Sequence, residues 1–265
     1  MPRLGLISSL TGGVPPQESA FSDSYSLDFD GTDDNVDIPQ SGTAFPSGAD
    51  PRTVSVWMKR GTDGNAQSGS EALFKYGWIR TNEMFTLAMW HLSKNLYFAG
   101  YSNDLDTGID IDDTDWHHLM VTFDGTTIVV YKDGGTAAGG EQDTSTAGNG
   151  GDWTNLDTNL EDPTDWGGFL IGMRDTYYTG GFIGKINDVA IWDVELSAAD
   201  VVAIYNSGAP NDLTDSGSYD TDRTGDLVGY WKFEEGSGST ATDSSEGGNN
   251  GTISGDTSYS TDVPS

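Results

Sequence analysis

Short runs in which apolar and polar residues alternate recur along this chain, and turns rich in glycine and aspartate separate them. Such alternation is the pattern of a β-strand with one buried face, because successive side chains of a strand point to opposite faces. Strands of this kind are typical of antiparallel sheets, so the chain is predicted to be all-β and antiparallel. The expected strands cover residues 25–29, 36–38, 53–58, 72–76, 84–90, 96–101, 118–123, 127–131, 169–173, 182–192, 227–233 and 252–254.

One segment has the spacing of a helix instead. Ser197 and Asp200 form a capping-box pattern, and apolar residues up to Ile204 recur at helical spacing. Gly208 follows as a stop signal. We therefore expect one short helix within residues 197–206.

The composition agrees with many short strands joined by tight turns. The 265 residues include 36 glycines and no cysteine. The absence of cysteine excludes a disulfide framework and any thiolate zinc site. A hydrophobic fraction of 35% supplies one core rather than two, so the length predicts one large domain.

The chain is strongly acidic, with 42 acidic and 12 basic residues and a formal net charge of -30. This charge repels phosphate backbones and anionic lipids, so we expect no nucleic-acid partner and no membrane-surface partner. No apolar run approaches the length of a membrane span, which predicts no membrane insertion. Two explanations of the acidity stay open: solubility in a salty medium and the binding of cations.

The N-terminal residues differ in character from the predicted strands. Residues 1–22 contain Gly-Gly and Pro-Pro pairs without periodicity, and they predict an N-terminal arm. Two alternatives stay open for it: a frayed chain end, or an arm that docks onto other subunits or proteins. The first ten residues lack the apolar core of a signal peptide, so export is not expected. Residues 23–265 are predicted to form a single domain, in which residues 226–254 complete the sandwich because so short a segment rarely sustains its own core.

Five segments together resemble a known family. Residues 25–36, 54–57, 116–123 and 184–192 are similar to successive strands of the laminin-G-like jelly roll, and residues 198–205 are similar to its short helix. The resemblance covers about residues 25–254. It implies a concanavalin A-like, antiparallel two-sheet jelly-roll sandwich with one short helix, often with one structural calcium and with sugar or protein binding at the loops. The segment around residues 230–252 precedes the first strand in relatives, so we expect a permuted strand order here.

Calcium is the expected cofactor, in a structural role. Asp30, Asp33 and Asp34 place oxygen ligands around a glycine turn, and the family resemblance puts Asn187 and Asp188 on a strand near them. Carboxylates and carbonyls are the ligands that calcium takes. The alternative is an aspartate-rich turn held by local hydrogen bonds. A second acidic run within residues 104–115 is expected to be a solvated loop.

The sequence does not predict an enzyme. Jelly-roll glucanases need a pair of correctly spaced carboxylates, which a Glu-any-Asp-any-Glu strand supplies. The chain has no such motif, and Asp193-Val-Glu195 lacks the first acid. His117 and His118 are adjacent on a predicted strand, so their side chains should diverge rather than share a metal.

The favoured hypothesis is a non-enzymatic structural or decoration protein on the surface of a virion. An acidic, cysteine-free sandwich with an N-terminal arm and no export signal fits this role, and the chain resembles jelly-roll proteins of marine phage virions. Under this hypothesis the chain is a homo-oligomer that contacts other virion proteins through residues 1–22 and meets host glycans on its outer side.

The alternative hypothesis is a carbohydrate-binding lectin or a cell-surface adhesion module of a prokaryote, with an extracellular location. Aromatic side chains on loops are the usual sugar contacts of such modules. The candidates are Trp153, Trp166, Tyr177 and Tyr178.

Overall fold

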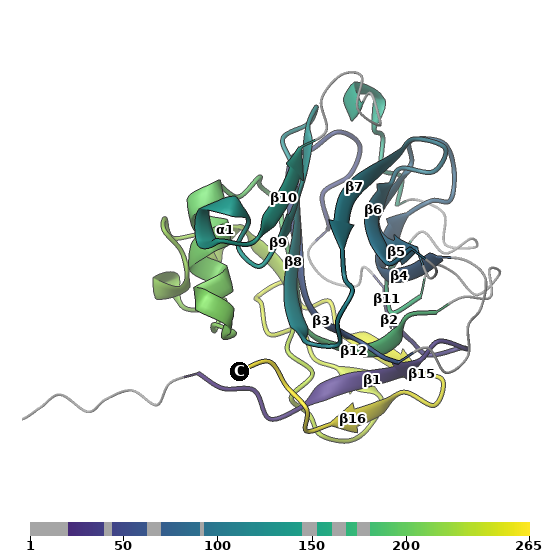
Figure 1. The fold of residues 1–265 in the computed structure, drawn as a ribbon, viewed down its shortest axis with the longest axis vertical. Coiled ribbons are helices and arrows are strands. Elements are labelled where there is room, and N and C mark those ends of the chain that lie inside the picture. The colour runs from purple at the N-terminus through teal and green to yellow at the C-terminus, as the bar shows by residue number, and fades with distance from the viewer. Residues whose placement is uncertain are drawn as a thin grey trace, which may run out of the picture.

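Two antiparallel β-sheets stack face to face in the computed structural model, which describes residues 21–39, 44–62, 70–90, 93–144, 153–160, 168–173 and 181–265 (Figure 1). Within these residues each sheet has eight strands, which confirms the predicted jelly-roll sandwich. The first sheet runs in the order β10 (Glu141–Thr144), β9 (Ile128–Lys132), β8 (Trp116–Phe123), β3 (Arg52–Arg60), β12 (Ile183–Trp192), β1 (Ser26–Asp30) and β16 (Ser258–Ser260), with β13 (Leu227–Trp231) also paired to β12. The second runs in the order β14 (Thr240–Ala241), β15 (Gly251–Ser254), β2 (Asn35–Ile38), β11 (Phe169–Ile171), β4 (Ser70–Gly77), β5 (Met84–Trp90), β6 (Asn95–Ala99) and β7 (Asp104–Asp110).

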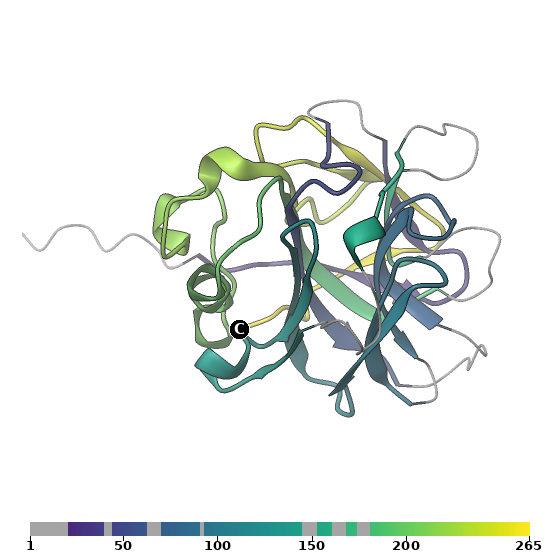
Figure 2. The same ribbon diagram turned by 90° about the horizontal axis from the view of Figure 1, so that it is seen from above.

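The helical elements are short and lie mostly on one side of the sandwich (Figure 2). Helix α1 (Ala198–Tyr205) begins with the expected capping box, because the Asp200 amide donates to the Ser197 hydroxyl at 3.1 Å. Its apolar side chains pack on the outer face of the first sheet, against residues such as Trp192. Among the described residues, no helix has the length and apolarity to cross a membrane. The 3-10 turns are η1 (Thr136–Ala138), η2 (Trp153–Asn155), η3 (Asn206–Gly208), η4 (Ser216–Ser218) and η5 (Thr224–Asp226).

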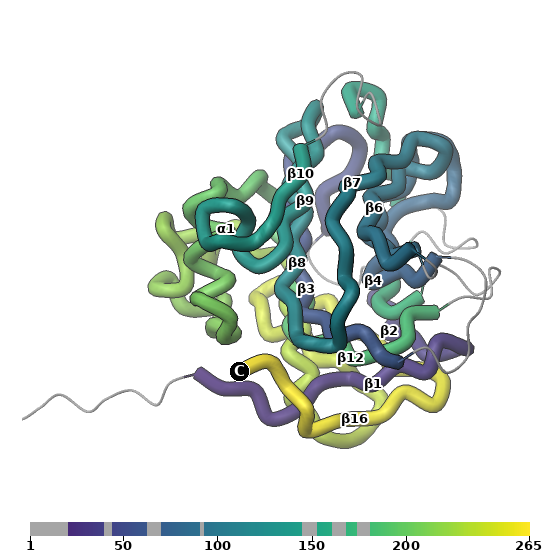
Figure 3. Tube along the Cα trace, in the orientation of Figure 1, coloured from purple at the N-terminus to yellow at the C-terminus, as the bar shows by residue number. Residues whose placement is uncertain are grey.

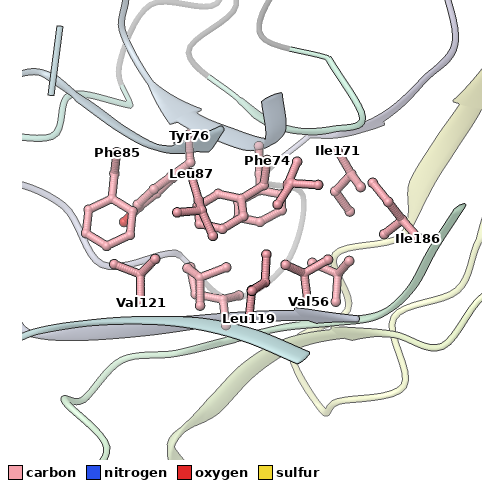
Figure 4. Packing of buried hydrophobic residues seen from close by; sticks show 14 of the residues in the cluster. Val56, Phe74, Tyr76, Phe85, Leu87, Leu119, Val121, Ile171 and Ile186 are labelled. Atoms are coloured by element: carbon pink, nitrogen blue, oxygen red, sulfur yellow. The ribbon is translucent and has the colours of Figure 1, made fainter. Parts of the chain in front are cut away.

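The core lies between the sheets, where the inward-facing side chains of the alternating runs meet. Phe74 of β4 stacks on Phe169 of β11 with ring centroids 5.8 Å apart. Each large apolar side chain buried in this way stabilises the fold by roughly 1.5–3 kcal/mol before ordering costs. Figure 4 shows side chains of the second sheet facing those of the first, among them Phe74, Phe85, Leu87, Val56, Leu119 and Val121.

Strand β12 is bordered by strands from both ends of the chain. One edge pairs with β3, with a register shift between Asn187 and Ala190. The other edge pairs first with β1, over residues 183–186, and then with β13, over residues 189–192. The C-terminal segment also supplies β15, which pairs with β2, and β16, which pairs with β1. Residues 227–260 therefore add strands to both sheets, and the start and the end of the described chain run side by side (Figure 3).

The last residues are held in place by Asp262. Its backbone oxygen accepts a hydrogen bond from the Ser26 hydroxyl at 2.7 Å. Its carboxylate accepts one from the Trp116 indole at 3.0 Å and forms an ion pair with Lys59 at 2.9 Å. These contacts fix the C-terminus beside the beginning of β1.

The acidic run that was expected to be a loop begins as a strand. Residues 104–110 form β7, in which Asp104, Asp106 and Asp110 are exposed while Leu105 and Ile109 point into the core. The apolar alternation of this run decides its structure, and the aspartates occupy only its solvent face. They are solvated, as predicted, but on a strand.

The Trp231→Ala variant tests how far the C-terminal segment supports the core. Trp231 is fully buried, stacks on Phe169 at 5.5 Å and donates its indole N–H to the Asn249 carbonyl at 2.9 Å. Truncating such a side chain to alanine is expected to cost about 3–5 kcal/mol of unfolding free energy, measured by urea denaturation. The control is Trp90→Ala, which truncates the same residue type at a site that is 44% exposed and should cost less than about 1 kcal/mol. Equal stability of the two variants would show that residues 227–260 are an appendage.

Candidate functional site

The turn between β1 and β2 brings three carboxylates together. One ligand oxygen from each of Asp30, Asp33 and Asp34 lies within 4.8 Å of the others. The turn is closed locally, because the Asp30 amide donates to Asp34 Oδ2 at 2.7 Å and the Thr32 amide donates to Asp30 Oδ1 at 2.8 Å. Gly31 supplies the left-handed backbone, with φ of 81°, that this reversal needs.

Asp34 is the buried member of this group. It is 2% exposed, and its Oδ1 has no hydrogen-bond partner. The turn between β15 and β16 closes over it so tightly that a Cβ at Gly255 would lie 2.5 Å from this oxygen. Burial raises the pKa of the Asp34 carboxyl above its usual value, against the lowering effect of the Asp30 amide, and the negative charge of Asp30 raises it further.

This donor set fits a hard cation. Calcium prefers carboxylate and carbonyl oxygens at flexible geometry, and a buried carboxylate oxygen without a donor is one that a cation could satisfy. Asp30, Asp33 and Asp34 would hold such an ion, and it would join the turn after β1 to the C-terminal turn at Gly255. Calcium at this turn stays a proposal.

Asn187 and Asp188 do not belong to this turn, which corrects the ligand set expected from the sequence. In the β1–β12 register Asp30 lies opposite Ile183, four residues before Asn187. At about 3.3 Å per residue, Asn187 is roughly 13 Å away along the strand. The family resemblance placed the two strands side by side, but only the register shows which residues meet.

The predicted glycan contacts have different outcomes. Trp166, Tyr177 and Tyr178 lie outside the described residues. Trp153, in η2, is 1% exposed and packs edge-to-face against Phe98 at 5.0 Å. Its ring belongs to the core and offers no face to a sugar, so the assignment of Trp153 as a ligand contact is wrong.

An aromatic side chain that was not predicted is better placed. Trp90, at the end of β5, is 44% exposed, the one large hydrophobic side chain so exposed in the described part of the chain. Its ring stacks on Tyr97 of β6, with centroids 4.5 Å apart and planes at 18°. The alternation of side chains along β5 could have identified it from the sequence. Phe85 and Leu87 point into the core, so Met84 and Trp90, which are an odd number of residues away from them, point outward.

The two adjacent histidines diverge, as predicted. His117 bonds through Nδ1 to Asp133 at 2.8 Å and through Nε2 to Asp113 at 2.9 Å. Burial lowers the pKa of His117, but its two aspartate partners outweigh burial and raise the pKa above its usual value. His118 points to the other face, where burial lowers its pKa to about 4. The pair therefore does not form a shared metal site.

Residues 30–202 match the laminin G-like family described as the Concanavalin A-like lectin/glucanases superfamily. The chain belongs to this family. The match covers more than half of the sequence and confirms the laminin-G-like resemblance, whereas nothing in the comparisons supports a likeness to phage virion proteins. No curated protein matches the chain.

Solved structures that are similar to this chain come from diverse proteins. A putative carbohydrate binding protein from Bacteroides ovatus is similar at 17% identity with a TM-score of 0.63, over 92% of this chain and 62% of that one. The heptameric SAP-like pentraxin from Limulus polyphemus is similar at 15% identity with a TM-score of 0.44, over 71% of this chain and 84% of that one. The CBM40 domain of a Ruminococcus gnavus sialidase is similar at 12% identity with a TM-score of 0.43, over 68% of this chain and 96% of that one. At 17% identity, the likeness to the Bacteroides ovatus protein shows the fold alone.

Calcium at the Asp30 turn predicts a specific response to chelation. An ion that binds only the folded state adds about 2.7 kcal/mol to the unfolding free energy when its free concentration is a hundred times the dissociation constant. Chelator should therefore lower the melting temperature, and calcium should restore it. The Asp34→Asn variant should lose at least part of this response, while Asp220→Asn, which removes an equal charge at an exposed position, should keep it. Full restoration by sodium chloride alone would show charge screening instead of binding.

Proposed function

We propose that this domain is a non-catalytic carbohydrate-binding module in which Trp90 is the sugar-stacking side chain. The observation that supports this proposal is the exposed Trp90 ring, which stacks on the Tyr97 ring with centroids 4.5 Å apart. A flat, pre-positioned aromatic face suits the apolar face of a sugar ring, and little side-chain entropy is lost on binding because the stack already fixes the rotamer.

Polar groups beside the stack could receive the sugar hydroxyls. On β7, Asp106 lies opposite Tyr97 in the strand register, and the Asn95 amide lies 3.5 Å from the Asp106 carboxylate. Asp104 and Asp110 line the same exposed strand. Carboxylates accept hydrogen bonds from hydroxyls but repel anionic groups, so the face suits neutral glycans rather than sialylated or sulfated ones.

The family supports this proposal, since its description includes lectins. The Bacteroides ovatus protein, which shares the fold at a TM-score of 0.63, is described as a putative carbohydrate binding protein. This chain spans 62% of that protein's length. Carbohydrate binding by the whole protein therefore enters here only as part of the proposal. A non-enzymatic role agrees with the absence of a Glu-any-Asp-any-Glu motif in the sequence.

The Trp90→Ala variant tests the proposal on an array of neutral, sialylated and sulfated glycans. The parent protein is expected to bind neutral glycans, and the variant should lose at least about tenfold in affinity, because most binding energy rests on a few aromatic anchors. Trp90→Phe, which keeps a ring, should retain part of the affinity. Unchanged binding by Trp90→Ala, or parent binding confined to anionic glycans, would contradict the proposal.

A second proposal concerns where the domain acts: on the surface of a virion, as an oligomeric decoration protein attached through residues 1–22. Its support is the net charge of -30, which suits an outward position, and the anchoring of the segment that follows the arm. The Glu234 carboxylate accepts hydrogen bonds from the amides of Ser24 and Tyr25, both at 2.9 Å, so the residues that follow the arm are held against the C-terminal part of the domain. An extracellular or cell-surface location is the alternative.

Deletion of residues 1–22 tests the attachment. We expect the shortened protein to keep the melting transition of the sandwich and to be missing from purified particles when co-expressed with the other particle proteins. Quantitative mass spectrometry of the particles gives the ratio of the two forms. Normal incorporation of the shortened protein would contradict attachment through the arm.

A further inference from the structure

His117 lies between two carboxylates that belong to different connections of the chain. Asp113 is in the connection between β7 of the second sheet and β8 of the first, whereas Asp133 follows β9. His117 Nε2 lies 2.9 Å from Asp113 Oδ1, and Nδ1 lies 2.8 Å from Asp133 Oδ2. The histidine is 7% exposed, so water does not freely replace either partner. Each ring nitrogen therefore faces an acceptor.

Two carboxylate partners require both ring nitrogens to donate. A neutral imidazole has one N–H, and only the charged imidazolium has two. Both carboxylates also accept from backbone amides: Asp133 Oδ1 from His118 at 3.1 Å, and Asp113 Oδ1 from Asp115 at 2.9 Å. Burial raises the pKa of the Asp113 carboxyl, but the Asp115 amide and His117 outweigh it and lower the pKa below its usual value. The contacts thus fit a positively charged His117 between two ionised carboxylates.

Two further cations of the first sheet hold the same connection. Lys132 Nζ of β9 donates to the Asp110 carbonyl at 3.0 Å, and Arg60 Nε of β3 donates to the Asp113 carbonyl at 3.3 Å. Histidine is the residue type whose charge changes near neutral pH, so His117 is the variable member of this group. The remaining titratable side chains of the segments that meet here are Asp110, Asp112, Asp115, His118, Glu141 and Tyr205.

The connection held by these cations also supports Trp90. Ile111 directly follows β7, and its amide donates to the Lys94 carbonyl at 3.0 Å. The Lys94 amide in turn donates to the Trp90 carbonyl at 2.7 Å. Residues 110–113 therefore join His117 to the end of β5 that carries the exposed Trp90 ring.

We propose that His117, with Asp113 and Asp133, forms a pH-sensitive clasp: the charged histidine holds the β7–β8 connection to the first sheet, and its deprotonation loosens this connection and weakens ligand binding at Trp90. The last clause rests on the proposed glycan site, whereas the clasp does not. After loss of the proton, one carboxylate faces a ring nitrogen that no longer donates, which leaves a buried contact unsatisfied. Lys132 and Arg60 keep the backbone attached, so a severalfold change is expected instead of a complete loss.

The direction of the pH dependence follows from the same contacts. Burial lowers the pKa of His117, but the hydrogen bonds to Asp133 and Asp113 outweigh it and raise the pKa above its usual value. Such a group adds stability that is fully present below its unfolded-state pKa and is lost as the pH rises through its folded-state pKa. The clasp should therefore be closed in mildly acidic solution and open at alkaline pH.

Nuclear magnetic resonance of the full chain labelled with nitrogen-15 measures the clasp directly. Both ring nitrogens of His117 should be protonated in mildly acidic solution, and the proton should leave at a higher pH than in a free histidine. Asp113→Asn is the central variant, because an amide can donate to Nε2 and a neutral imidazole then satisfies both neighbours. It should move the titration to lower pH. Asp112→Asn removes an equal charge at the exposed neighbouring position and should leave the titration unchanged.

Hydrogen exchange of the Ile111 amide supplies an independent measurement. After correction for the intrinsic rate at each pH, exchange in the parent should speed up severalfold as His117 loses its proton. This alkaline step should be absent from Asp113→Asn and present in Asp112→Asn. The Asp113 side chain is 53% exposed, so the substitution should not prevent folding.

Two readouts follow the effect at Trp90. Its indole N–H signal, assigned by its absence in Trp90→Phe, should shift with the titration of His117. Affinity for a neutral glycan should fall severalfold over the same pH range in the parent and stay constant in Asp113→Asn. His91 follows Trp90 in the sequence and is another histidine, so His91→Gln is the second control and should retain the alkaline loss.

A His117 that titrates at or below the usual histidine range would overturn the clasp, and so would an Ile111 amide whose exchange does not follow the charge of His117. A Trp90 signal that stays constant through this titration would overturn the coupling. If the parent binds no glycan at any pH, the proposed function fails, while the signals of His117, Ile111 and Trp90 still decide the clasp and its reach.

Discussion

Pairing along the second edge of β12 is the constraint on which much of this structure depends. A ten-residue strand in the middle of a sheet leaves buried N–H and C=O groups on both sides, and each needs a partner. One side is covered by β3, but the other is covered in two parts, by β1 and then by β13. The N-terminal and C-terminal parts of the domain are thereby joined, and the junction between the two partners creates the gap at Asp188.

The sequence predicts the strands and the helix better than it predicts the contacts between them. Alternation identifies most strands, and the capping box at Ser197 identifies the helix, because both patterns are local. Register is not local. The sequence around Asn187 does not indicate whether this residue lies opposite the start or the end of β1. Trp153 illustrates the same limit, since a polar loop around it suggests exposure while its ring fills the core beside Phe98.

Several basic residues of the described chain are buried or paired with carboxylates, and the net charge of -30 leaves the surface strongly negative. Arg52 is fully buried and donates to the Tyr76 hydroxyl and to the Gly48 carbonyl, among others. Lys59 and Lys132 are paired with carboxylates on neighbouring segments. The positive charges therefore serve as internal connections, and an approaching ligand meets mostly aspartate. A neutral partner with many hydroxyls, or a cation, is compatible with such a face.

The position of Asp262 has a mechanical consequence. The chain enters and leaves the domain at the same end of the β1–β16 pair, since Ser26 lies opposite Ser260 and bonds to Asp262. A force that pulls the two ends apart would therefore peel these strands one hydrogen bond at a time instead of shearing them together. The contacts of Asp262 with Lys59 and Trp116 would carry the load first. The domain should thus yield at low force from its ends while the remaining sandwich stays intact.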